Sequence, residues 1–186
     1  MQLIDAISQR RSIKRFTDRP VTREEIETML SVATLAPNHR LTEPWRFYVL
    51  GPEARAAYGA ALGDRKAKKL PDPAAATAMR ERIAAEHRAL PCMIAVAVVA
   101  NENPEIAEED YASTMMGLQN LNLAAVELGL GAQIRTGAVM NDPAARAAIG
   151  AREGERVVAI VSVGEPADLP PATRRAGAGE RTTWVG

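Results

Sequence analysis

Apolar residues recur at helical spacing in the first part of the chain. A helix is predicted over residues 2–10, where three apolar side chains fall on one face. A second helix is predicted to begin after Thr22, because the segment TREE has the pattern of a capping box and apolar residues follow it at helical spacing. This helix should end near Pro37, since the residue before a proline disfavours helical backbone geometry.

Continuous apolar runs predict the strands of a buried sheet. Residues 45–50 (WRFYVL) indicate a first strand, and residues 93–100 (MIAVAVVA) are an unbroken apolar run, typical of a strand buried on both faces. Residues 156–163 (RVVAIVSV) predict a last buried strand. Residues 53–90 are rich in alanine and in charge, and they predict two helices that meet around the prolines of the segment LPDP.

The longest helical pattern covers residues 110–128, and its polar residues do not gather on one side. A helix that is apolar nearly all round must be buried, either at the centre of a large fold or against another subunit. In a chain of 186 residues the second alternative is simpler, so we expect an obligate dimer. Gly129 and Gly131 are expected to end the helix.

The last part of the chain predicts a short helix and a tail. Asp142 and Pro143 should start the helix, and Gly150 should end it. Beyond Gly164 the chain is rich in Pro and Gly, yet it carries Trp184, which suggests docking onto a partner subunit. Helices alternating with strands predict one α/β sandwich domain over residues 1–186, in which residues 164–186 form an extended C-terminal arm.

The amino-acid composition narrows the classes of protein to which this chain could belong. Hydrophobic residues make up 47% and charged residues 25%, as in ordinary globular proteins. The single cysteine excludes an internal disulfide bond and favours a reducing compartment. The sequence shows neither a signal peptide nor an apolar run of about 18 residues that could span a membrane. We therefore expect a cytoplasmic protein with no membrane partner.

The formal net charge of +0 excludes a uniformly basic surface for nucleic acid. This sum hides segments of opposite sign, because residues 10–19 and 174–181 are cationic and residues 102–110 are anionic. We expect the two cationic segments to converge on one phosphate in a folded dimer.

Arg10, Arg11 and Ser12 stand at the C-terminal end of the first predicted helix. The planar forked donors of arginine suit a phosphate, and serine adds a hydroxyl donor. Cations also favour a helix C-terminus, where the helix dipole is negative. The pattern alone therefore leaves a purely structural role open.

Two further segments could line a site. Residues 36–45 crowd amide, imidazole, guanidinium and indole groups into one loop, although a solvated turn leading into a core Trp45 explains them equally. Residues 129–137 contain three glycines, but these follow a helix and lack the spacing of a dinucleotide fingerprint. They predict a short strand that presents Gln133 and Arg135 to a flat ligand, or merely a helix cap and an edge strand.

Other catalytic chemistry is not predicted. Two histidines and one cysteine lack metal-ligand spacing, with His87 expected in mid-helix and Cys92 at the head of a buried strand. No nucleophile motif of the form G-x-S-x-G is present. The acidic residues 108–110 are expected where the long helix begins, since acidic side chains are favoured there by the helix dipole. No catalytic residue and no metal site are therefore assigned.

Four segments in this order resemble the FMN-dependent nitroreductase family, in its small single-domain branch: RRSIKRF, APNHRLTEPWRFYVL, GLGAQIRTG and VSVGEP. The resemblance spans nearly the whole chain. It implies a central, mostly antiparallel sheet flanked by helices, and a homodimer that exchanges its C-terminal arms. FMN would bind non-covalently at the subunit interface, with NAD(P)H as electron donor.

The resemblance also implies a set of cofactor-binding residues: Arg10, Arg11, Ser12, Leu35, His39, Ile134, Arg135, Thr136 and Arg175. The first three would contact the phosphate and ribityl chain, with Arg175 a weaker candidate for the phosphate. His39 would approach the flavin from the other subunit, while residues 134–136 flank it within the first. Some relatives carry a basic residue at position 35, so Leu35 is expected to be an apolar neighbour.

The implied activity is a ping-pong reaction, in which NAD(P)H reduces the flavin and an electron-poor acceptor such as a nitroaromatic or a quinone reoxidises it. Two alternatives remain open. One is a specialised flavin reductase, dehalogenase or flavin-fragmenting enzyme on the same scaffold, for which residues 62–90 would form a lid. The other is a non-catalytic dimeric scaffold or flavin-storage protein.

Overall fold

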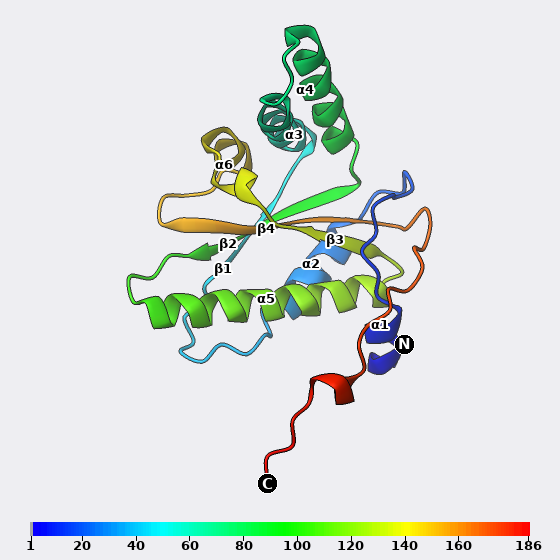
Figure 1. Cartoon of the computed structure of the whole chain (residues 1–186), viewed down its shortest axis with the longest axis vertical. Helices are drawn as coiled ribbons and strands as arrows, with labels where there is room; N and C mark the ends of the chain where they lie inside the picture. Colours follow the sequence, from blue (N-terminus) through cyan, green and yellow to red (C-terminus); the bar gives the residue numbers. More distant parts are fainter. Residues whose placement is uncertain (1) are drawn as a thin grey trace.

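A four-stranded antiparallel sheet forms the centre of the computed structural model, which describes residues 2–186 (Figure 1). The strands are β1 (Trp45–Val49), β2 (Cys92–Val99), β3 (Gly131–Arg135) and β4 (Glu155–Gly164). They lie in the order β1-β2-β4-β3, so β4 is internal and β3 is an edge strand. The predicted antiparallel sheet flanked by helices is confirmed.

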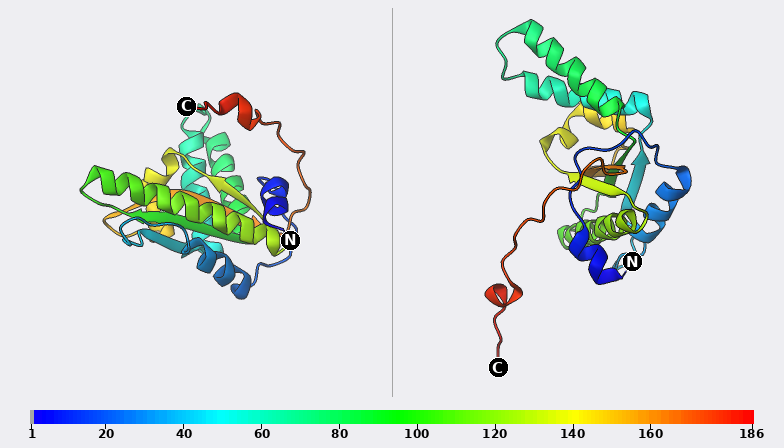
Figure 2. Two further views of the ribbon diagram at one scale, coloured as in Figure 1. Left: turned by 90° about the horizontal axis from the view of Figure 1, so that it is seen from below. Right: turned by 90° about the vertical axis from the view of Figure 1, so that its right-hand side faces the viewer.

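Helices cover both faces of the sheet. The layer that includes the longest helix contains α1 (Leu3–Gln9), α2 (Arg23–Ala33) and α5 (Pro104–Glu127). The opposite layer contains α3 (Pro52–Ala67), α4 (Pro73–Arg88) and α6 (Pro143–Ile149). Figure 2 shows α3 and α4 projecting from the sheet on the side opposite to α5. None of the helices within residues 2–186 is long and apolar enough to cross a membrane.

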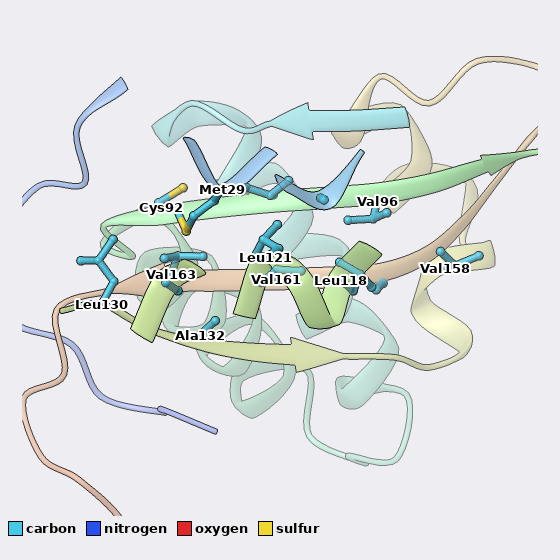
Figure 3. Close-up of a cluster of buried hydrophobic side chains, with 14 of the residues drawn as sticks. Met29, Cys92, Val96, Leu118, Leu121, Leu130, Ala132, Val158, Val161 and Val163 are labelled. Carbon is cyan, nitrogen blue, oxygen red and sulfur yellow. The ribbon is translucent and has the colours of Figure 1, made fainter. Parts of the chain in front are cut away.

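Strand β2 lies between two hydrophobic cores, which explains why its sequence is an unbroken apolar run. Its alternate side chains enter two separate cores, because successive residues of a strand point to opposite faces. Ile94 and Val96 pack with Leu118 and Leu121 of α5, as Figure 3 shows for three of these residues. Met93 belongs instead to the core beneath α3 and α6. Polar residues are therefore excluded from both faces of this strand.

The predicted helix ends are confirmed at several points. Thr22 Oγ1 accepts a hydrogen bond from the Glu25 amide at 3.2 Å, and the Glu25 carboxylate accepts one from the Thr22 amide at 2.8 Å. Gly129 ends α5 with a φ of 72°, a left-handed conformation that favours glycine. Gly131 does not end the helix but belongs to β3, where a Cβ atom would collide with Ile13.

Two helix positions differ from expectation. Helix α5 begins at Pro104 rather than near residue 110, because the Asn103 side chain caps it by accepting a hydrogen bond from the Glu105 amide at 3.0 Å. The acidic residues 108–110 therefore lie beyond the first turn, and side-chain partners described below account for two of them. His87 lies in the last turn of α4, not in mid-helix.

The chain leaves large apolar side chains exposed around α1, α2 and α5 and in the tail. These are Leu3, Ile4, Ile7, Leu35, Met116, Leu169, Trp184 and Val185. One face of α5 is buried, whereas Met116 on another face is exposed. Residues 171–186 are exposed throughout, and Figure 2 shows this arm running away from the sheet. Trp184 is 91% exposed, so this chain alone provides no docking surface for it.

Helices α3 and α4 pack closely because glycine stands at their contact. A Cβ atom on Gly59 would lie 2.7 Å from the Ile83 carbonyl oxygen and 2.9 Å from the His87 Cβ. No real Cβ atom tolerates such distances to backbone. Gly59 therefore sets the separation of the two helices.

We expect Gly59→Ala to lower the free energy of unfolding by about 1–3 kcal/mol, because overpacking forces α4 away from α3. Urea unfolding followed by circular dichroism measures this. Gly179→Ala is the matched control, since no heavy atom lies within 4 Å of its added Cβ. Equal stability of the two variants would contradict the tight packing of α3 on α4.

Candidate functional site

The segment that follows α1 runs along the free edge of the sheet. Ser12 forms a parallel bridge with Ala132 of β3, and the Ile13 amide donates to the Ala132 carbonyl at 3.1 Å. Further on, Thr17 is tied to Glu165, just beyond β4. These bonds place the cationic end of α1 beside β3.

Side chains from this segment and from the C-terminal arm surround a first hollow, the cationic pocket, of about 490 Å³. Its cations are Arg10, Arg11, Lys14 and Arg175, and Ser12 also lines it. No carboxylate is among the lining residues. The structure thus brings together the four residues that the sequence predicted around a phosphate, which are Arg10, Arg11, Ser12 and, from the arm, Arg175.

Arg11 combines both roles that the sequence left open. Its Nη1 donates to the main-chain carbonyls of Ser8 at 2.7 Å and Arg10 at 2.9 Å, which caps the end of α1. Its Nε is buried and has no hydrogen-bond partner. A buried donor without an acceptor is costly, so an acceptor atom of a ligand is expected there.

A second hollow of about 660 Å³, the strand pocket, lies between β3 and the α3–α4 pair. Gln133, Arg135 and Thr136 line it on the β3 side. Apolar residues of the other elements complete it: Tyr58, Leu62, Ile83, Leu90, Val139 and Met140. Lys66, Glu86 and His87 also line it, so the polar strand faces a wall of mixed apolar and charged residues.

Lys14 lines both pockets, so the two hollows meet at this residue. The sequence reasoning assigned no role to it. The available signal was its spacing from Ser12, because residues two apart in an extended segment lie on the same side. Lys14 therefore joins the predicted set as a further candidate for ligand binding.

Arg135 reaches into the strand pocket from the end of β3. Its Nε donates to Gln133 Oε1 at 3.1 Å, and its Nη1 lies 3.1 Å from His87 Nε2. Burial lowers the pKa of Arg135, and burial together with the charge of Arg135 lowers the pKa of His87. Burial also raises the pKa of Tyr58 to about 12. His87 and Tyr58 also line this pocket, and no sequence motif had marked them as candidates.

Three predicted residues lie outside these pockets. Ile134 packs against the core on the α5 side, because alternate residues of β3 face opposite ways. Leu35 is 76% exposed just after α2. His39 is exposed in the loop before β1, where its Nδ1 lies 3.0 Å from Glu109 Oε1. Their contact with a flavin stays a prediction.

The loop that carries His39 is fixed to α5 by side-chain contacts. Thr42 donates a hydrogen bond to the buried Asp110 carboxylate. Arg40 Nε donates to Glu109 at 3.0 Å, and the bonds from His39 and Arg40 lower the pKa of Glu109. Leu41 has a φ of 51°, in the left-handed region that non-glycine residues rarely adopt. The loop is thus held in one strained conformation.

Within residues 2–186, no three His, Cys, Asp or Glu side chains are arranged to hold a metal ion. The site consists of the two pockets joined at Lys14.

Comparison with known proteins identifies the family. The model of the nitroreductase family matches residues 7–165, which is most of the chain. The chain belongs to the nitroreductase family. The resemblance inferred from the four sequence segments is therefore confirmed.

Individual members of the nitroreductase family extend the match to the whole chain. The "Putative NAD(P)H nitroreductase YfhC" of Bacillus subtilis is 34% identical over 185 residues, covering 97% of this chain and 93% of the relative. A crystal structure of a nitroreductase-like family protein from Bacillus cereus has a TM-score of 0.85 at 28% identity, covering 100% of this chain and 96% of the other.

A further nitroreductase structure contains a cofactor. The Desulfovibrio desulfuricans protein, solved in complex with FMN, has a TM-score of 0.72 at 26% identity and covers 97% of this chain and 95% of its own. The nitroreductase fold predicted from the sequence is confirmed by these structures.

Proposed function

We propose that this chain binds FMN without a covalent bond and uses NAD(P)H to reduce electron-poor small molecules such as nitroaromatics or quinones. The observation that supports this most strongly is the pair of pockets joined at Lys14. FMN has the matching form, because a doubly charged phosphate is joined through a polar chain to a flat ring. The FMN complex of the relative from Desulfovibrio desulfuricans agrees with this proposal.

The residues of the cationic pocket fit the phosphate end of FMN. Four cations line the pocket without a carboxylate, and the buried Arg11 Nε lacks an acceptor. A phosphate supplies several strong acceptor oxygens, so it would satisfy this donor and neutralise the surrounding charge. Arg10, Arg11 and Lys14 would bind the phosphate, and Ser12 would donate to it or to the ribityl chain. Arg175 would close the pocket from the arm.

The strand pocket fits the ring of FMN. Leu62, Ile83 and Leu90 provide apolar surface against which a flat ring could pack. Arg135 and Thr136 border the pocket on the β3 side, and the Arg135 guanidinium can stabilise negative charge on a ligand. When bound, FMN supplies the redox chemistry by accepting a hydride from NAD(P)H and passing two electrons to the acceptor.

The volume of the strand pocket supports a ping-pong order. About 660 Å³ is within the range for one bound small molecule, so with the FMN ring in this pocket the electron donor and the acceptor would reach the open face of the ring in turn. Residues of α3 and α4 line this space and would select the acceptor. Because α3 and α4 would select the acceptor, a specialised reductase on this scaffold stays a second candidate function.

The exposed apolar residues support a homodimer. Leu35, Met116 and Trp184 are too large and too exposed to be expected together on a monomer surface. We propose that the arm docks on the partner subunit, and that His39 and Leu35 approach the flavin of the other subunit. The single, free and buried Cys92 suits a reducing compartment such as the cytoplasm.

The proposed activity predicts a coloured protein that responds to NAD(P)H. Purified protein should show flavin absorbance that NADH or NADPH bleaches without oxygen, and that a nitroaromatic or a quinone restores.

Arg11→Ala should lower FMN affinity at least tenfold, since a hydrogen bond to a charged group contributes about 1.5–3 kcal/mol. Retained flavin and equilibrium titration measure this.

Arg23→Ala is the matched control for Arg11→Ala, because Arg23 is exposed on α2 and pairs only with Glu27 in the next turn. It should retain FMN like the wild type. Colourless wild-type protein that gains nothing from added FMN would contradict the proposed function. Flavin that NAD(P)H does not bleach would indicate a non-catalytic binding protein instead.

The proposed dimer predicts a mass in solution of about twice 20.0 kDa by light scattering. Trp184→Ala should raise the dimer dissociation constant about tenfold or more, because burying a large aromatic side chain contributes about 1.5–3 kcal/mol. A monomeric wild type, or a dimer that does not respond to Trp184→Ala, would contradict docking of the arm on the partner.

A further inference from the structure

Arg135 is a partly buried cation without a direct ion-pair partner, although the Glu86 carboxylate lines the same pocket and favours its charge. No ion pair that the structure records within residues 2–186 includes it, and both of its hydrogen-bond partners are neutral groups, Gln133 Oε1 and His87 Nε2. A guanidinium that is not bonded to a carboxylate keeps its N–H donors available for a ligand. Its direction in the strand pocket therefore depends on these two neutral acceptors.

The contacts of His87 define its protonation. The Ile83 carbonyl lies 2.8 Å from His87 Nδ1 and can only accept, so Nδ1 must carry the hydrogen. Arg135 can only donate, so Nε2 must present its lone pair. Only the neutral ring with hydrogen on Nδ1 satisfies both contacts. A protonated ring would be repelled by the charges of Arg135 and Lys66, and its Nε2 could no longer accept a hydrogen bond from Arg135.

Packing leaves this imidazole little freedom to turn. His87 is 6% exposed, and its ring lies against Tyr58 with ring centroids 5.7 Å apart. Glycine at position 59 brings the backbone of α3 close to the Cβ of His87. The His87 ring is thus held in place by α3 and α4, and its Nε2 in turn holds Arg135 of β3.

The charges around His87 favour its neutral form. Arg135 from β3 and Lys66 from α3 disfavour a proton on the ring, while Glu86 on its own helix favours one. Lys14 also lines this pocket, and Tyr58 stays neutral because burial raises its pKa. Burial is the largest cause that lowers the pKa of His87. The ring is therefore neutral at pH 7 and can accept from Arg135.

We infer that His87 is a positioning residue, whose unprotonated Nε2 directs the Arg135 guanidinium into the strand pocket toward the ring of bound FMN. This inference rests on the proposed function, because it concerns the ligand of that pocket. His87 acts through Arg135 and does not itself carry out chemistry. It also gives the α3–α4 pair a role in cofactor binding, besides lining the space for the acceptor.

A double-mutant cycle tests this role by titrating FMN into the flavin-free protein. His87→Ala should weaken FMN binding about tenfold when Arg135 is present, the effect of about one hydrogen bond to a charged group. In the Arg135→Met background, His87→Ala should change the affinity less than twofold. His87→Gln, which keeps an acceptor, should restore most of the affinity. The reduction potential of bound FMN should fall in His87→Ala and recover in His87→Gln.

A merely structural role predicts a different result. If His87 only supports α4, His87→Ala weakens FMN binding equally in both backgrounds, and that additivity would overturn the inference. A failure of the proposed function is distinguishable, because wild-type protein would then bind no FMN at all. FMN binding by the wild type with an additive cycle would overturn the inference alone.

A measurement without FMN tests the contact itself. Nitrogen-15 NMR should show hydrogen on Nδ1 of His87 at pH 7. Arg135→Met should raise the pKa of His87, since the nearby positive charge and the donated hydrogen bond are both removed. His39, the only other histidine, is the internal control and should not change. A pKa of His87 that does not respond to Arg135→Met would overturn the inference.

Discussion

Positive charge that forms no direct ion pair within the protein is the constraint on which this site depends. Arg11 is held by main-chain carbonyls, and Arg135 by an amide oxygen and an imidazole nitrogen. Neutral acceptors fix the direction of a guanidinium without neutralising it. Partly buried cations of this kind reduce stability unless a ligand supplies the missing charge. The zero net charge of the whole chain thus coexists with a local excess of cations, which an anionic cofactor would compensate.

The edge strand β3 makes this arrangement possible. An open edge exposes unpaired backbone groups, and here the segment after α1 bonds to part of it at Ser12 and Ile13. Gly131 gives Ile13 room to pack, so the cationic end of α1 lies beside the polar face of β3. The α3–α4 pair forms the opposite wall, and Gly59 sets the separation between its two helices. Backbone pairing and glycine packing therefore determine where the charges stand.

Local signals predicted most of the fold and part of the site. A continuous apolar run located β2 and a mainly apolar segment located β4, because both faces of these strands are buried, and the capping box located the start of α2. The contact between His87 and Arg135 joins residues 48 apart in sequence, so no local pattern could reveal it. The start of α5 was misplaced because its Asn103 cap stands in a polar segment. His39 and Leu35 lie away from the pockets, and their predicted roles need a second subunit.

The central claim is that cations of the first pocket recognise the phosphate of FMN. The affinities of FMN and riboflavin, measured by titration of flavin-free protein at several salt concentrations, test it most directly. Two charge-assisted hydrogen bonds predict that FMN binds about 100-fold more tightly than riboflavin, and that salt reduces the difference. Equal affinities, or a difference that salt does not change, would contradict recognition of the phosphate by this pocket.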